Sequence, residues 1–172
     1  QRALVDSKYN ERCAECMKGL ALLQKVKPVY NLCELSSADI DMVAEAITDE
    51  CIFKRVRHCI TENERVLAAV AALKAGDLPK LGELLKASHD SLRRDYEVTG
   101  LELDTLADAA NAEPCCLGAR MTGAGFGGCA IALVQKDAVA EFTARVGNAY
   151  TEKTGLTASF FACEAGDGAR RV

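Results

Sequence analysis

The chain has 172 residues, 49% of them hydrophobic and 27% charged, with a formal net charge of −4 at pH 7. A chain of this size and composition can bury a hydrophobic core and form one domain. The acidic balance provides no basic face for nucleic acid or an anionic membrane surface. The longest uncharged run has 15 residues, between Arg120 and Lys136, whereas a membrane-spanning helix needs about 20 apolar residues.

The start of the chain and its cysteines indicate the compartment. The chain begins with Gln1 and shows no basic-then-apolar leader, so we expect a piece of a longer cytoplasmic protein. Nine cysteines are an odd number in a chain large enough to fold without disulfides, which favours free thiols. Cys13 and Cys16 have half of a zinc-ribbon spacing, but Cys33 begins no second pair because Ser36 stands where sulfur would be needed. We therefore expect no metal or redox site there.

The hydrophobic pattern predicts five helices before the first strand, because apolar residues recur at steps of three and four. Pro28 closes the first helix, Gly76 ends the third and Asp77 caps the fourth. Thr99 and Glu102 form a capping-box pattern for the fifth. A short hinge predicts that the third and fourth helices pack antiparallel. The expected ranges are 6–26, 36–47, 49–73, 78–92 and 99–110. The apolar stripe expected on the third helix comprises Ile52, Val56, Cys59, Val66, Val70 and Leu73.

After residue 110 the pattern becomes strand-like. Residues 117–121 and 129–134 predict two strands, and the second is an unbroken apolar run that favours burial on both faces. Asp137 is the expected cap of a last helix, and residues 156–163 predict a closing strand reached by a right-handed crossover. The sequence thus predicts one α+β domain, a small, mainly antiparallel sheet with helices packed on one face. We expect residues 164–172 to form a loose tail.

Four of the chain's 13 glycines fall within residues 123–128, between the two predicted strands. Glycine permits positive φ values, and such turns can direct several backbone N–H groups to one point, where they bind an anionic oxygen. The alternative is a tight hairpin in which the glycines only satisfy the turn geometry. The pattern by itself favours neither interpretation.

Three known glycine loops do not fit this segment. Gly123, Gly125 and Gly128 match the G-x-G-x-x-G pattern of dinucleotide-binding folds, but a strand follows the loop where those folds need a helix. The chain contains neither a Val-Ala-Ile-Lys strand nor a His-Arg-Asp sequence, which protein kinases require. A Walker loop is excluded because no Lys-Ser or Lys-Thr pair ends the run.

Residues 118–129, Gly-Ala-Arg-Met-Thr-Gly-Ala-Gly-Phe-Gly-Gly-Cys, closely resemble the third signature motif of galactokinases. These enzymes belong to the superfamily of galactose, homoserine, mevalonate and phosphomevalonate kinases. Residues 9–12 with Cys16, residues 57–66 and residues 91–106 resemble three further blocks of the family, so the resemblance covers most of the chain. It implies the C-terminal half of a two-domain sugar kinase, with a ferredoxin-like C-terminal kinase domain over residues 1–172.

The resemblance implies that the whole protein transfers the γ-phosphoryl group of Mg-ATP to the anomeric hydroxyl of galactose, giving galactose 1-phosphate. The family's galactose-recognition motif, its phosphate loop with the magnesium-binding serine, and its catalytic aspartate and arginine have no match here. The resemblance therefore assigns no catalytic and no metal-binding residue to this chain, and Mg-ATP would be bound mainly by the N-terminal half, its native partner. Phosphoryl transfer needs the metal, charge compensation and a positioned nucleophile together, so we expect this chain alone to be inactive.

Two features carry over from the family residue by residue. Tyr9 matches the sugar-contacting tyrosine, whose phenol can pack on a pyranose and hydrogen-bond a hydroxyl, although such a residue can also be a core aromatic. Ala124 departs from members that have glycine there, and it preserves the turn if its φ is negative. The glycine loop that faces the family's active-site cleft is matched by Thr122, Gly123, Ala124, Gly125, Phe126, Gly127 and Gly128.

Several polar residues are expected to be structural. We expect His58 on the surface or at an interface, Asn63 as a buried amide, and Asp95 and Asp104 as solvated charges or caps. Residues 89–91, His-Asp-Ser, are adjacent on a helix and point in different directions, so they cannot form a triad.

Other functions remain open. One is a related kinase that uses N-acetylgalactosamine or another small alcohol. Another is a non-catalytic regulator of the same fold that binds galactose and ATP. A third is a self-standing α+β ligand-binding or regulatory module.

Overall fold

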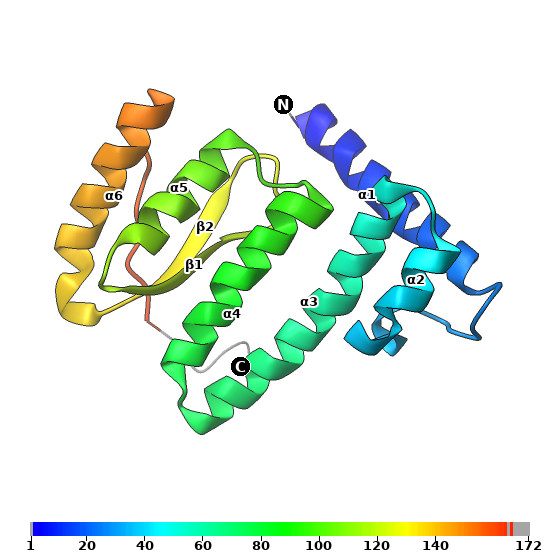
Figure 1. Ribbon diagram of the computed structural model, residues 1–172. Helices are drawn as coiled ribbons and strands as arrows, with labels where there is room; N and C mark the ends of the chain where they lie inside the picture. Colours follow the sequence, from blue (N-terminus) through cyan, green and yellow to red (C-terminus); the bar gives the residue numbers. More distant parts are fainter. Residues whose placement is uncertain (1, 165, 167–172) are drawn as a thin grey trace, which may run out of the picture.

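The computed structural model describes residues 2–164 and 166, with side chains from Lys8 onward (Figure 1). Of the tail expected over 164–172, all but residues 164 and 166 lies outside the described part. The described part contains no helix long and apolar enough to cross a membrane. Its helices are α1 (Arg2–Leu23), α2 (Ile40–Ala46), α3 (Glu50–Ala75), α4 (Leu78–Ser91), α5 (Leu101–Ala112) and α6 (Val139–Thr154), and its strands are β1 (Cys116–Thr122) and β2 (Cys129–Val134).

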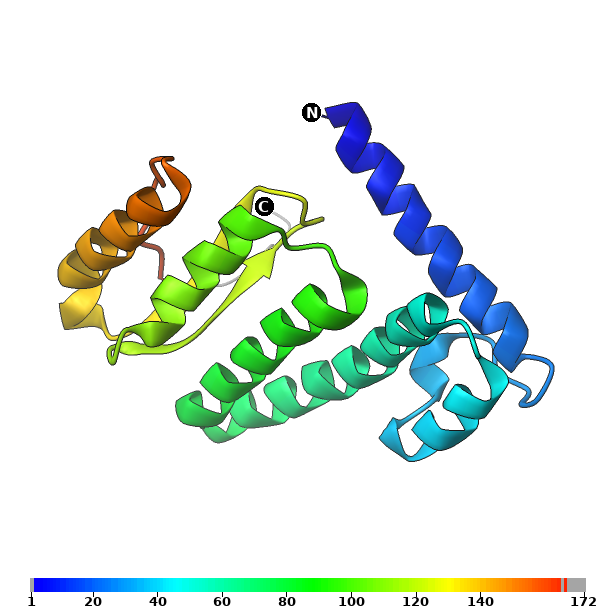
Figure 2. The same ribbon diagram turned by 45° about the horizontal axis from the view of Figure 1, so that its top comes forward.

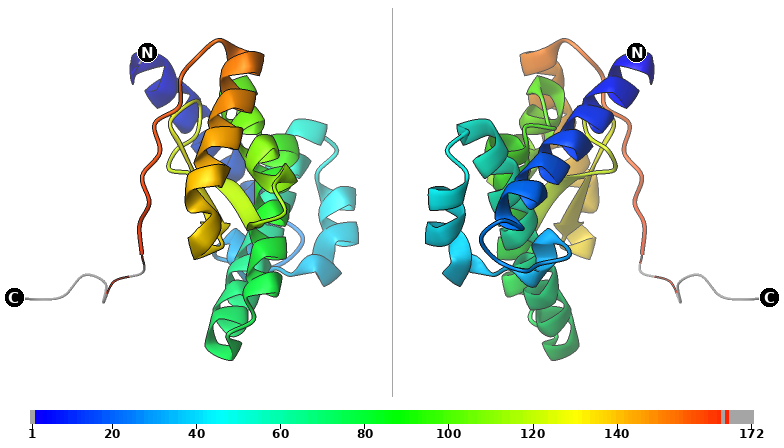
Figure 3. Two further views of the ribbon diagram at one scale, coloured as in Figure 1. Left: turned by 90° about the vertical axis from the view of Figure 1, so that its left-hand side faces the viewer. Right: turned by 90° about the vertical axis from the view of Figure 1, so that its right-hand side faces the viewer.

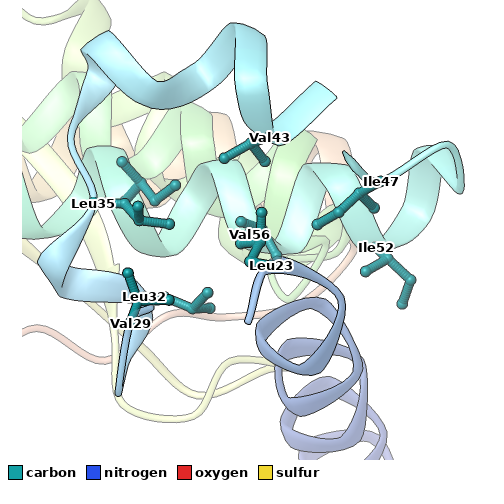
Figure 4. Close-up of a cluster of buried hydrophobic side chains, with 9 residues drawn as sticks. Leu23, Val29, Leu32, Leu35, Val43, Ile47, Ile52 and Val56 are labelled. Carbon is teal, nitrogen blue, oxygen red and sulfur yellow. The ribbon is translucent and has the colours of Figure 1, made fainter. Parts of the chain in front are cut away.

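The first core cluster lies where α1, the loop after it and α2 pack on the N-terminal half of α3 (Figure 4). Helix α3 begins where the Asp49 carboxylate accepts a hydrogen bond from the Ile52 N–H and ends at Gly76, whose φ is 69°. The buried side chains of this cluster are Leu23, Val29, Leu32, Leu35, Val43, Ile47, Ile52, Val56 and Ile60.

The second half of the predicted α3 stripe does not face a core. Val66 is 52% exposed, and Val70 and Leu73 are also exposed. The stripe prediction is therefore right for Ile52, Val56 and Cys59, which is partly buried against the same cluster, and wrong beyond them, because α1 and α2 cover only the first turns of this long helix. Helices α3 and α4 do pack against each other as an antiparallel hairpin, as predicted (Figure 1).

The sheet has two antiparallel strands, which pair from Cys116 with Val134 to Thr122 with Cys129. Helices α4 and α5 both pack on β1, and α6 packs on α5 (Figure 2). The expected α+β class, a small antiparallel sheet with helices packed on one face, is confirmed. The prediction that 129–134 is buried on both faces is wrong, since Ile131 is 50% exposed. Among the residues that the structure describes, β2 pairs only with β1, so one of its edges has no strand partner there.

The closing strand predicted over residues 156–163 is also wrong, and with it the crossover. This segment is extended but pairs with no strand, and it runs beside α6 (Figure 3). There Phe160 approaches Gly147 while Phe161 is 86% exposed. An apolar run can select an extended backbone, but a strand also needs a partner, which is a property of the tertiary structure.

Two predicted caps do not form. Helix α5 follows Gly100, whose φ is 85°, and the Thr99 side chain is buried without capping the helix. Asp137 lies inside the one-turn 3-10 helix Lys136–Ala138, and α6 begins after Ala138 with no side-chain cap. Asp77 does cap α4, because its carboxylate accepts from the Lys80 N–H at 2.9 Å.

Candidate functional site

The turn between β1 and β2 has an unusual backbone. The φ values of Gly123, Gly125, Gly127 and Gly128 are 82°, 81°, 100° and 114°, and that of Phe126 is 58°. In this turn only Ala124 lacks a positive φ. Ala124 therefore stands at a position where a side chain causes no backbone strain, whereas Phe126 adopts the left-handed region that favours glycine.

The loop 123–128 is anchored at its middle and open at both ends. The Phe126 N–H donates a hydrogen bond of 2.7 Å to the Val98 carbonyl oxygen, and a Cβ atom on Gly125 would lie closer than 3.0 Å to that same oxygen. At Gly123, Gly127 and Gly128 an added Cβ would meet nothing within 4 Å. The backbone is thus fixed at its middle and accessible at both ends.

A cavity of about 740 Å³ lies against this loop. Its walls come from residues 125–128, from Leu103 and Leu106 of α5, from Tyr150 of α6, and from Lys8 of α1. In Figures 1 and 3 the N-terminal half of α1 runs beside the loop. Tyr9, which follows Lys8, is 55% exposed and so is not a core aromatic. Tyr9 itself is not among the residues that line this cavity, whereas its neighbour Lys8 and the loop residues 125–128 are.

His58 is buried, in contrast to the surface position expected for it. Its Nδ1 lies 2.9 Å from the Ser91 Oγ, and its ring stacks on Tyr96 with the centroids 4.5 Å apart. Burial lowers the pKa of His58 to about 4, so the imidazole is neutral at pH 7. The surrounding Lys and Arg residues suggested a surface helix, but the packing of α4 on α3 covers this position.

The expected solvated charges are in fact paired. Asp95 is buried and forms an ion pair with Arg57. Asp104 lies 2.9 Å from the Arg93 Nε and 3.2 Å from the His89 Nε2. Asn63, expected to be buried, is only partly buried and donates to a backbone carbonyl of the loop after α1. In each case a residue from another element contacts the side chain, and the local sequence pattern does not show such tertiary partners.

Residues 89–91 point in three directions, as expected. His89 is buried, and its Nδ1 accepts a hydrogen bond of 3.1 Å from the Met121 N–H. Asp90 is exposed and pairs with Arg94 on the same helix. The three side chains serve packing and helix contacts and do not form a triad.

Cys16 and Cys59 lie together where α1 crosses α3, with their sulfurs 3.7 Å apart. The hydrogen bond from Cys59, together with one from the Tyr96 hydroxyl, lowers the pKa of Cys16 to about 7. All nine cysteines are free, and Cys13, the partner of Cys16 in the sequence motif, is exposed. The part of the chain described contains no group of three or more His, Cys, Asp or Glu side chains placed to hold a metal.

Two buried arginines were not predicted from the sequence. Arg12 on α1 and Arg55 on α3 are among the most buried charged residues of the described chain, and both contact the turn that follows α4. A signal was available: Arg12 stands four residues before Cys16, and Arg55 stands three residues after Ile52 and four before Cys59. Charged residues at inward-facing helical positions indicate buried ion pairs.

Comparison with known proteins gives one consistent result. Residues 69–152 match the protein family described as GHMP kinases C terminal. Over all 172 residues the chain is 54% identical to the galactokinase of Exiguobacterium sibiricum and 52% identical to that of Enterococcus faecalis, in each case over 44% of the relative's length. The crystal structure of Lactococcus lactis galactokinase complexed with galactose is similar with a TM-score of 0.89 and 54% identity, covering 90% of this chain and 40% of that one. The chain thus spans less than half the length of the curated relatives it matches.

Proposed function

We propose that the protein containing this chain phosphorylates galactose, on the premise that the chain corresponds to the C-terminal region of the galactokinases. In this reaction the γ-phosphoryl group of ATP moves to the anomeric hydroxyl of the sugar. The observation that carries the proposal is the loop 123–128, whose backbone is open at both ends, in a chain that matches galactokinases along its whole length. A module unrelated to kinases would not account for that match.

Tyr9 and the loop 123–128 are the residues of this chain that we propose for the site. The exposed Tyr9 phenol can pack on the sugar ring and hydrogen-bond one of its hydroxyls. The loop can present backbone N–H groups to phosphate oxygens without any positively charged side chain. A solved relative of the same fold is complexed with galactose, which supports a sugar site in this family.

The residues of this chain fit Mg-ATP only in part. The open ends of the loop can approach phosphate oxygens, but the described residues gather no acidic cluster for the cation. When bound, Mg-ATP supplies the transferred group and charge neutralisation. We therefore propose that it is bound mainly by residues outside this chain, in an N-terminal domain that the longer relatives leave room for. This chain alone is then inactive.

The test is ATP consumption by the complete gene product and by this chain alone, each with and without galactose. The proposal expects galactose-dependent turnover by the complete product and none by the chain alone. Tyr9→Phe should raise the KM for galactose, whereas Tyr30→Phe, a matched change at an 89% exposed residue, should not. Turnover with N-acetylgalactosamine but not with galactose would show that N-acetylgalactosamine is the substrate. Binding of galactose without ATP consumption would indicate a regulator instead.

A further inference from the structure

Two guanidinium groups hold three consecutive backbone carbonyls of the turn after α4. Arg12 donates from its Nε to the Tyr96 oxygen at 2.7 Å and from its Nη2 to the Glu97 oxygen at 3.2 Å. Arg55 donates from its Nη1 to the Asp95 oxygen at 2.6 Å. Both arginines are buried, and they come from two different helices, α1 and α3.

The turn needs these donors because of its own backbone. Helix α4 ends in a π-helical turn, Leu92–Tyr96, and Glu97 follows with a φ of 54°. The last carbonyls of a helix have no partner within it, and buried carbonyls require one. The planar guanidinium of arginine can serve two such acceptors at once, which a lysine ammonium cannot do with the same geometry.

The buried charges of the two arginines are compensated. The Glu15 carboxylate lies 3.1 Å from Arg12 and 2.7 Å from Arg55, so it joins the two guanidinium groups. The Glu97 side chain pairs with the Arg55 Nη2 at 2.7 Å. A buried ion network of this kind is weak evidence for stability alone, since apolar residues of similar volume often serve as well or better. A role in fixing geometry is the alternative explanation.

The turn continues directly into Val98, the residue that anchors the glycine loop. Val98 follows Glu97, and its carbonyl oxygen accepts the Phe126 N–H. Gly125 packs so closely on this residue that no side chain would fit. In Figures 1 and 2 the turn lies between the loop and the two helices that carry the arginines. A displacement of the Glu97 backbone therefore displaces the anchored middle of the loop.

We propose that Arg12 and Arg55 are positioning residues, which fix the position of the glycine loop relative to α1, the helix that carries Tyr9. Arg12 lies three residues after Tyr9 on α1, so one helix carries both the proposed sugar contact and the donor that fixes the turn. This inference rests on the proposed function for its effect on turnover. The structural coupling between Arg12 and the loop does not depend on it.

The first test is hydrogen exchange at the Phe126 amide in the complete gene product, below its unfolding temperature. Arg12→Lys keeps the charge but loses the double contact to the turn. The protection factor of the Phe126 amide should then fall at least about tenfold, because local opening of the loop would cost less free energy. Arg94→Lys is the matched control, because Arg94 is exposed and its ion pair within the described residues is with Asp90, one turn earlier. Unchanged protection in Arg12→Lys would overturn the proposal.

The second test is steady-state kinetics on the same variants. Misplacing a reacting group by about 1 Å can cost on the order of 100-fold in rate, so kcat should fall in Arg12→Lys and Arg55→Lys, while the ATP and galactose KM values change less. Added guanidinium should restore part of kcat in Arg12→Ala. A variant that only unfolds more easily would keep kcat per folded molecule, and that result contradicts the proposal. Wild-type protein without galactokinase activity would refute the proposed function, while the exchange result would still decide the coupling.

Discussion

Gly82 of α4 and Gly118 of β1 meet backbone to backbone. A Cβ atom added to Gly118 would lie closer than 3.0 Å to the Gly82 carbonyl oxygen, and one added to Gly82 would lie equally close to the Leu117 carbonyl oxygen. Helix α4 can therefore approach the sheet only because both positions lack a side chain. The same strand leads into the loop 123–128, so this contact sets the distance between the α3–α4 hairpin and the candidate site.

Gly118→Ala should destabilise the chain by about 3 kcal/mol, because the methyl group meets backbone atoms that cannot move aside. Urea denaturation of the chain measures this difference. Gly147→Ala on α6 is the control. Its added methyl meets only the ring edge of Phe160, at 3.3 Å, and alanine favours a helix by up to about 1 kcal/mol. Equal free energies of unfolding for the two variants would contradict the close approach of α4 to β1.

The glycines of the loop should differ in their tolerance of alanine. Gly125→Ala combines a φ of 81° with a clash against Val98, whereas Gly123→Ala has a similar φ but open space around it. We expect Gly123→Ala to cost about 1–2 kcal/mol of backbone strain and Gly125→Ala to cost clearly more and to release the anchor at Val98. Thermal unfolding and galactose-dependent turnover, measured in parallel, would rank the two variants. The reverse ranking would show that the anchor is not at Val98.

Local signals predicted the helices well, because caps and stops such as Asp77 and Gly76 act within one turn. The sequence could not show what covers each face. Ile131 lies in an apolar run that indicates a buried strand, yet in the described part of the chain β2 has a strand partner on one side only. His58 stands among basic residues that suggest solvent, yet α4 covers it.

The candidate site was likewise predictable only in part. The glycine spacing predicted a loop with positive φ values, and residue chemistry alone accounts for that. The contacts that place the loop join residues far apart in the sequence, such as Arg12 with Tyr96 and Val98 with Phe126. No local pattern encodes such a pair, although a charged residue at an inward-facing helical position can indicate that one exists.

Two aspartates with the same expected role should behave differently. Asp77→Ala removes the acceptor for the Lys80 N–H at the start of α4 and should cost about 1 kcal/mol. Asp137→Ala removes no cap, because the Asp137 side chain makes no such bond, and we expect a change within about 0.5 kcal/mol. Asp77→Asn, which keeps an acceptor, should restore most of the loss. Chemical denaturation of the three variants is sufficient, and equal losses at 77 and 137 would show that the cap at α4 does not contribute.

Stability should fall on mild acidification because of the buried histidines. Burial lowers the pKa of His58 to about 4, and burial together with Arg93 also lowers the pKa of His89. The charged groups around His58 are Glu62, Arg65, Asp95 and Arg120, whose effects are smaller than that of burial.

Between about pH 6.5 and pH 4 the unfolded chain then binds more protons than the folded one, so the free energy of unfolding decreases as the pH falls. For His58 the loss is on the order of 3 kcal/mol over this window. The paired carboxylates, whose pKa values are lowered, add their own loss mainly below about pH 4.5. The upper part of the window therefore reports the histidines.

Nuclear magnetic resonance can follow the two histidine rings directly, since the chain has only two. The ring of His58 should remain neutral at pH 5.5, and His58→Asn should flatten the pH dependence of unfolding between pH 5 and pH 6.5. An imidazole that titrates near 6.5 in the folded chain would show that solvent reaches His58, and the packing of α4 on α3 around Ser91 and Tyr96 would then be wrong.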